Sequence, residues 1–258
     1  MRYILTGARV LYITQKLKDS IGNIATPRVR WSCVSSNLHM VFEAYEPLES
    51  RPGISILLSM AYRFRSINSY IKYLRLLAKN PRNVHAAWLL SRLYLVREYI
   101  DDPASSYDCV NTVILNRDMR GTYLAMLLIV NAMCNDESND VIILDDITTL
   151  PIREDVILRI IRVTRGLMNT WIVMHSIGDL STDELNTPTI ITSHSGLSKI
   201  ASKYRDIFNT IDENEALYIG VRYKLKINLN HVREIRSKLI EELNTKCKLP
   251  ASTPTTLT

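Results

Sequence analysis

Two adjacent carboxylates at the end of an apolar run are the residues of this chain best suited to chemistry. Asp145 and Asp146 directly follow the aliphatic residues 141–144. An unbroken run of this kind predicts a strand that is buried on both faces, as in a parallel sheet. Acids at the carboxyl end of such a strand lie where open α/β sheets bind ligands. In nucleotide-hydrolysing proteins a pair of this kind holds Mg²⁺ and orients an attacking water.

A hard cation usually needs more than two ligands from its site. Asp179, Asp183 and Glu184 follow the next apolar run and are the candidates for a third or fourth ligand. The alternative is that Asp145 and Asp146 only end the strand and cap the loop that follows it.

Basic residues form a second set of candidates, for contact with nucleic acid or a protein partner. Over residues 63–82 they are interleaved with tyrosines, a mixture that suits phosphates and stacked bases. The alternative is a solvated helix face whose long side chains cover apolar surface. Three more alternate along a predicted strand and therefore face one side, where they contact a partner or protect a sheet edge. The candidates are Arg63, Arg65, Lys72, Arg75, Arg222, Lys224 and Lys226.

Alternating strands and helices must position these residues. We predict a three-layer α/β domain with a mostly parallel central sheet and antiparallel strands toward the C-terminal edge. Possible strands within residues 1–36 precede a buried strand at 38–44. The other predicted strands are 109–115, 140–146, 170–176, 189–193, 202–211 and 216–229, the last two forming a hairpin around residues 212–215. The predicted helices are 54–67, 69–80, 84–100, 120–135, 151–167 and 231–246. Residues 1–247 form one domain with its core at 38–229, followed by a disordered tail at 248–258.

The composition is that of a globular protein. The 258 residues are 47% hydrophobic and 22% charged, with a net charge of +6, and the pI near 9.1 permits an acidic partner without demanding one. The four cysteines lack the spacing of a zinc site. With no signal peptide or membrane span expected, we predict a cytoplasmic protein with reduced cysteines. Gln15 is the only glutamine, which is compatible with a thermophilic source.

The residues 38–229 resemble the RecA and KaiC-like group of the P-loop NTPase superfamily. The segment VIILDDITTL is similar to the Walker B strand, with Asp145 matching the metal-associated aspartate. The doublet is also similar to the related AAA+ proteins, which implies a position near the attacking water for Asp146. TWIVMHS is similar to the next core strand, which implies a phosphate-sensing role for Ser176. The paired strands near the C-terminus look like those that end RecA and KaiC-like domains.

The phosphate loop of that superfamily is missing. A working loop reads G-x-x-x-x-G-K-[ST], because small residues let backbone N–H groups surround the phosphates, and the lysine and hydroxyl bind phosphate and Mg²⁺. By its position after the 38–44 run, the corresponding loop has Ala44 and Glu49 at the glycine positions. Ser50 replaces the lysine and Arg51 replaces the hydroxyl residue. We therefore expect no cofactor, with ATP and Mg²⁺ as the alternative.

The resemblance implies a non-catalytic paralogue that acts as a binding or regulatory subunit. The setting would be a DNA-associated assembly, in recombination or repair, or another hetero-oligomer. Its expected partner is a RecA-family recombinase or another ring subunit, in a homo- or hetero-oligomer. Two alternatives stay open. One is a metal-dependent ATPase or phosphoester hydrolase that uses Asp145 and Asp146, and the other is a protein that binds DNA directly.

Overall fold

The computed structural model describes residues 10–17, 22–48, 52–101, 110–134, 141–153, 155–157, 170–173, 189–191, 215–219, 223–226 and parts of 230–241. Its main sheet has five strands in the order β2-β5-β1-β6-β7, and every pairing is parallel. The predicted α/β class with a parallel sheet is therefore confirmed. The strands are β1 (Val10–Thr14), β2 (Asn23–Ile24), β5 (Val110–Ile114), β6 (Val141–Asp145) and β7 (Thr170–Val173).

Strand β1 lies at the centre of the sheet and is buried on both faces. Leu11 and Ile13 belong to the main hydrophobic cluster, which they share with the helices. Val10 and Tyr12 point the other way and are also buried. The neighbouring β6 has Val141 buried on one face and the cluster residues Ile142 and Leu144 on the other, while Ile143 is partly buried. Burial on both faces explains the continuous apolar runs of these strands and confirms the prediction made from residues 141–144.

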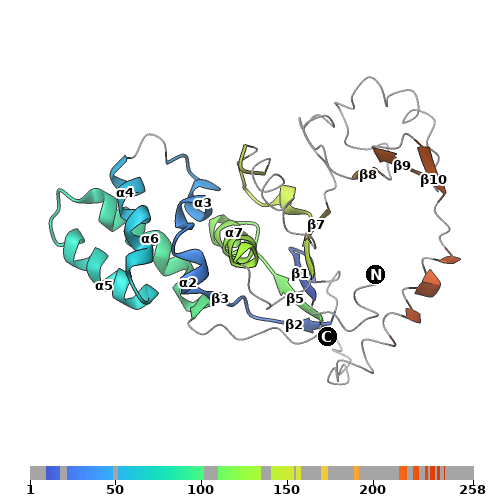
Figure 1. Ribbon diagram of the computed structural model, residues 1–258, viewed down its shortest axis with the longest axis horizontal. Helices are drawn as coiled ribbons and strands as arrows, with labels where there is room; N and C mark the ends of the chain where they lie inside the picture. The colour runs from blue at the N-terminus through green and yellow to red at the C-terminus, as the bar shows by residue number, and fades with distance from the viewer. Residues whose placement is uncertain are drawn as a thin grey trace, which may run out of the picture.

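Helices fill the space on one side of the sheet. Figure 1 shows the longest of them, α7, between the sheet and a group of shorter helices. Eleven consecutive residues of α7, 121–131, are buried, as expected of a helix that is covered on all sides. The helices on this side are α2 (Trp31–Val34), α3 (Leu38–Glu43), α4 (Pro52–Met60), α5 (Ile67–Ala78), α6 (Val84–Val96) and α7 (Met119–Met133), with short 3₁₀ turns η2 (Ala61–Arg63) and η3 (Arg97–Tyr99).

The group α2 to α6 is an excursion of the chain between two strands of the main sheet. The chain enters it through β3 (Val29–Arg30) and leaves it through β4 (Ile100–Asp101), which pair in parallel. Inside the group, α5 begins with a capping box made by Ser66 and Ser69, and α6 begins at Asn83, whose side chain accepts from the Ala86 N–H. These caps satisfy N–H groups that a helix start otherwise leaves without partners.

The prediction of a strand at residues 38–44 is wrong, because this segment is the helix α3. Leu38, Val41 and Phe42 are spaced three and four residues apart and are fully buried. A short apolar run satisfies both a strand and a helix pattern, so its length could not decide between them. The segment 29–34 is likewise a two-residue strand followed by α2.

The C-terminal strands also differ from the prediction. Strand β9 (Glu215–Ile219) pairs antiparallel with β10 (Tyr223–Lys226) and with β8 (Thr189–Ile191). In the described part of the chain these three form a sheet of their own, and the segment 216–229, predicted as one strand, contains most of β9 and all of β10. The predicted hairpin of residues 202–211 around residues 212–215 is not tested, because residues 202–214 lie outside the described ones. Residues 155–157 are helical, within the predicted helix 151–167. The predicted strand 202–211 and the tail 248–258 lie outside the described residues.

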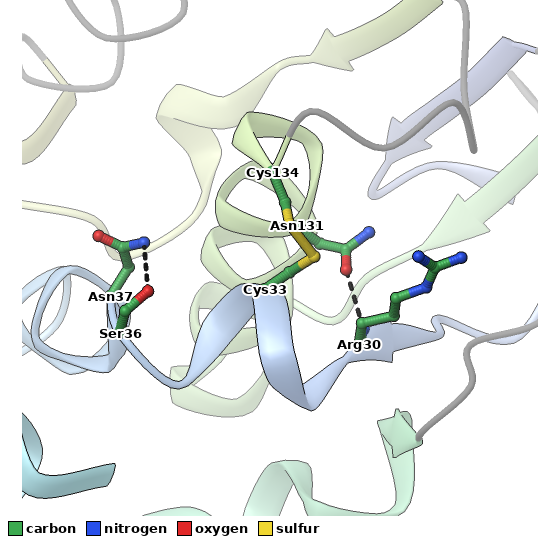
Figure 2. The surroundings of a disulfide bond; sticks show 6 residues. All are labelled: Arg30, Cys33, Ser36, Asn37, Asn131 and Cys134. Carbon is green, nitrogen blue, oxygen red and sulfur yellow. Dashed lines mark hydrogen bonds between the residues drawn. A yellow bond between two sulfur atoms is a disulfide. The ribbon is translucent and has the colours of Figure 1, made fainter. Parts of the chain in front are cut away.

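A disulfide ties the helical group to α7. Figure 2 shows Cys33 of α2 bonded to Cys134 at the end of α7, with their Cα atoms 5.4 Å apart. Close by, the Asn131 Oδ1 atom accepts a hydrogen bond of 2.8 Å from the Arg30 backbone N–H. The prediction of reduced cysteines is therefore wrong for this pair. Its partners are separated by 101 residues, and pairings over such distances are not readable from one sequence.

None of the helices in the described part of the chain combines the length and the hydropathy required to span a bilayer.

The start of α7 depends on a glycine. Asp118 caps the helix by accepting a 2.7 Å hydrogen bond from the Gly121 N–H. A Cβ atom at residue 121 would lie 1.8 Å from the Asn116 carbonyl oxygen.

We expect Gly121→Ala to lower the free energy of unfolding by about 1–3 kcal/mol, although helix propensity alone would raise it by about 1 kcal/mol. Urea titration checks the sign. As a control, Ala87→Gly on the exposed face of α6 should cost only about 1 kcal/mol. A Gly121→Ala protein as stable as the wild type would contradict this packing.

Loss of the disulfide should destabilise the fold. A cross-link over about 100 residues removes much entropy from the unfolded chain, so Cys33→Ala with Cys134→Ala should lower the free energy of unfolding by about 2–4 kcal/mol. Dithiothreitol should lower the melting temperature of the wild type and leave that of the double variant unchanged. Peptide mapping without reduction should recover the linked Cys33 and Cys134 peptides. Free Cys33 in the unreduced native protein would contradict the pairing.

Candidate functional site

The two acids lie at the point where the strand order of the sheet reverses. From β1 the chain continues to β2 and β5, toward one edge of the sheet, whereas from β6 it continues to β7, toward the opposite edge. The carboxyl ends of β1 and β6 therefore flank a switch point, the place at which open α/β sheets bind ligands. Asp145 is the last residue of β6 and Asp146 follows it. The predicted position of the acidic pair is thus observed.

The carboxylate of Asp145 is bound by two hydroxyl groups of β1. Its Oδ2 atom accepts hydrogen bonds from Tyr12 Oη at 2.6 Å and from Thr14 Oγ1 at 3.2 Å. The strand register places Ile13 opposite Leu144, so Tyr12, Thr14 and Asp145 all lie on the face of the sheet away from the main cluster. All three are buried. A buried carboxylate needs such donors, because its burial without them is costly.

Asp146 has a left-handed backbone conformation and forms an ion pair. Its φ and ψ are 57° and 37°, a region that aspartate enters more readily than most residues. This turn directs the chain from β6 into η4 (Ile147–Thr149). Its Oδ2 atom lies 3.3 Å from Lys16 Nζ, and the Asp146 side chain is only 3% exposed. The ammonium group of Lys16 thus provides the positive charge that this buried carboxylate requires.

Further hydrogen bonds fix the two loops to each other. The Lys16 backbone N–H donates to Thr14 Oγ1 at 3.2 Å. Thr149 Oγ1 lies 2.7 Å from Gln15 Oε1 and 2.9 Å from the Asp146 carbonyl oxygen. The residues that follow β1 are therefore held against those that follow β6, and the crevice between the strands contains side chains of the chain itself.

This arrangement differs from an open cation site. A divalent cation is bound by several carboxylate, carbonyl or water oxygens, whereas here one oxygen of each carboxylate already faces a donor of the protein. Over the part of the chain that the structure describes, no group of three or more His, Cys, Asp and Glu residues could hold a metal. The sequence candidates Ser176, Asp179, Asp183 and Glu184 lie outside the described residues.

The position of residues 44–51 in the sequence suggested the remnant of a phosphate loop, and the structure does not support this interpretation. This segment follows a helix rather than a strand, so the positional argument for Ala44 fails. The Ala44 carbonyl instead accepts a 3.0 Å hydrogen bond from the Arg153 N–H, beyond β6. Glu49, Ser50 and Arg51 lie outside the described residues. None of the eight glycines in the sequence is followed by lysine, so G-K-[ST] occurs nowhere in it.

Glu46 in that loop has a structural partner. Its Oε1 atom lies 2.6 Å from a guanidinium nitrogen of Arg92 on α6, and this guanidinium stacks over the Trp88 ring at 4.7 Å. Burial, and then the Glu46 carboxylate, raises the pKa of the nearby Tyr123 to about 12, so its phenol stays protonated. This cluster joins α3, α6 and α7 and was not predicted from the sequence.

The basic candidates are divided between two parts of the fold. Arg63, Arg65, Lys72 and Arg75 are all exposed on the helical group. Lys224 and Lys226 belong to β10, an edge strand of the three-stranded sheet as described. Arg222 lies outside the described residues.

Searches of family models, curated proteins and solved structures find no match to this chain. Functional conclusions must therefore come from its own residues.

The sequence analysis did not predict the partners of the acidic pair, which are Tyr12, Thr14 and Lys16. The signal that could have found them is the second buried strand, VLYIT, which also ends in polar residues and continues into Gln15 and Lys16.

The hydroxyl of Tyr12 should matter for stability. In Tyr12→Phe the Asp145 carboxylate loses its shorter donor while the ring remains, so we expect the free energy of unfolding to fall by about 1–3 kcal/mol. Tyr62→Phe is the matched control, because Tyr62 is 59% exposed and should be nearly neutral. Chemical denaturation measures both variants. Equal stabilities for the two would show that the Tyr12–Asp145 hydrogen bond contributes nothing.

Proposed function

We propose that this chain is a non-catalytic member of the RecA and KaiC-like group that acts as a binding or regulatory subunit. The observation that carries the proposal is the state of the acidic pair. Tyr12 and Thr14 donate to Asp145, and Lys16 pairs with Asp146. One oxygen of each carboxylate is thus engaged by side chains of the protein, at the position where a metal ion or its water would bind in an active nucleotide-hydrolysing enzyme.

The strand arrangement supports the choice of group. β6, which carries the Walker B-like run, pairs with β1 and β7 in a parallel sheet. The acids follow its carboxyl end, and β9 and β10 form an antiparallel hairpin later in the chain. These features agree with the part of the resemblance that was drawn from residues 141–150 and the strands after them. The part drawn from a strand at residues 38–44 and the loop after it fails, because that segment is the helix α3.

The missing phosphate loop supports the non-catalytic assignment. Binding of a triphosphate in this superfamily depends on backbone N–H groups and on the lysine of the loop. No G-K-[ST] sequence is present in the chain. Lys16 does not replace the lysine of the phosphate loop, because its ammonium group is paired with Asp146. A subunit of this kind contributes to an assembly through contacts rather than through hydrolysis.

We further propose that the assembly is DNA-associated, with a RecA-family recombinase or another ring subunit as the partner. The net charge of +6 favours an acidic ligand over small-molecule metabolism. Lys224 and Lys226 on the edge strand β10 are candidates for the protein contact.

Calorimetric titration with ATP tests the non-catalytic assignment. With Mg²⁺ present we expect no saturable binding in the micromolar range, because the acidic pair is engaged and no phosphate loop exists. The titration should be repeated with Asp145→Asn, which keeps an oxygen acceptor for Tyr12 but removes the charge that a cation needs. Tight binding by the wild type that requires Mg²⁺ and disappears in Asp145→Asn would instead support the ATPase or phosphoester hydrolase alternative.

A further inference from the structure

The positive charge of the chain is concentrated in one part of the fold. Residues 52–97, which run from α4 through α6 to the first residue of η3, contain eight basic residues and no acidic residue, and Glu98 follows them directly. The rest of the chain has 24 basic and 26 acidic residues. The net positive charge thus originates in the helical group. The eight are Arg63, Arg65, Lys72, Arg75, Lys79, Arg82, Arg92 and Arg97.

Three of these residues form a line along α5. Lys72, Arg75 and Lys79 are exposed and follow each other at intervals of three and four residues, so they lie on the same side of the helix. The opposite side of α5 is buried through Tyr70, Ile71 and Leu74. The three basic residues therefore face solvent, because the packing of the buried side of α5 fixes the orientation of the helix.

Side-chain contacts join this line to α6. The Arg75 Nε–H donates to Tyr94 Oη at 2.7 Å, and the Arg75 guanidinium lies 5.6 Å from the centre of the Tyr94 ring. The Arg97 Nε–H donates to Asn68 Oδ1 at 3.1 Å. The exposed surfaces of α5 and α6 are therefore continuous. We call this surface the α5–α6 face, made of Asn68, Lys72, Arg75, Lys79, Tyr94 and Arg97.

The α5–α6 face also offers an exposed ring beside a hollow. Tyr94 is 43% exposed. Together with Asn68 and Arg97 it lines a pocket of about 640 Å³, whose wall also includes Arg120 at the start of α7 and Glu98, with which Arg120 forms an ion pair. An aromatic ring, an amide and guanidinium groups are the groups that stack on and hydrogen-bond to unpaired bases.

We propose that the α5–α6 face binds single-stranded nucleic acid. Its lysines and arginines would contact the phosphates, and Tyr94 would stack on a base at the pocket. A duplex hides the faces of its bases, so the exposed ring favours a single strand. This surface is separate from the acidic pair, and the inference does not depend on whether the chain binds ATP.

Fluorescence anisotropy with a labelled oligothymidylate of about 16 nucleotides and with a duplex of equal length tests the proposal. We expect salt-dependent binding of the single strand by the full chain. Lys72→Gln with Lys79→Gln should weaken it and reduce the slope of log affinity against log salt by about 1.4, since each lost phosphate contact removes about 0.7. Tyr94→Ala should weaken single-strand binding about 5-fold or more and leave duplex binding nearly unchanged.

The matched control is Arg233→Gln with Lys238→Gln, which removes two exposed charges elsewhere in the chain. This variant should bind the single strand like the wild type. An equal loss in the control would overturn the proposal, because it would show an effect of net charge alone. So would an absence of binding at low salt, or binding to phosphatidylserine vesicles that the oligonucleotide does not compete with. A preference for the duplex with no effect of Tyr94→Ala would also contradict it.

Discussion

The contact between the ends of β1 and β6 brings two buried carboxylates and their partners together at the centre of the main sheet. Asp145 is buried, and its carboxylate is stabilised by the hydroxyls of Tyr12 and Thr14. Asp146, in a left-handed turn, is stabilised by Lys16. Tyr12 and Thr14 are placed by the parallel register of the two strands, and Lys16 lies two residues beyond the end of β1. Removal of these donors would leave buried charge, whose cost exceeds that of most single contacts. The pair therefore stabilises the sheet at the position where open α/β sheets bind ligands.

The remainder of the described fold is organised around α7. It packs against the sheet on one side and against the helical group on the other (Figure 1), and the Cys33–Cys134 bond fixes its C-terminal end. The capped turn at Asp118 and Gly121 fixes the other end. The basic face of α5 and α6 is thereby held in a fixed orientation relative to the sheet. A binding role needs only such a rigid surface, whereas catalysis needs an open and correctly charged site.

The parts of the fold that the sequence predicted are those with long or unbroken patterns. β5, β6 and β7 and the helices α5, α6 and α7 occur where runs of apolar residues or helical spacing indicated them. The short segment 38–43 was ambiguous and was predicted wrongly. In the site, the acids were predicted but their partners were not, because Tyr12 and Thr14 lie 133 and 131 residues away in the sequence. The order of the strands in the sheet brings these residues together, and local sequence patterns do not predict strand order.

If Tyr12, Thr14 and Lys16 hold the two carboxylates, the pair should not bind a divalent cation. Anomalous scattering from crystals grown with Mn²⁺ and a nucleotide tests this. We expect no manganese within about 2.6 Å of either carboxylate, with Lys16 still beside Asp146 and Tyr12 still donating to Asp145. A manganese ion bound to Asp145 or Asp146, with nucleotide phosphates next to it and Lys16 displaced, would show instead that the pair is a cation site.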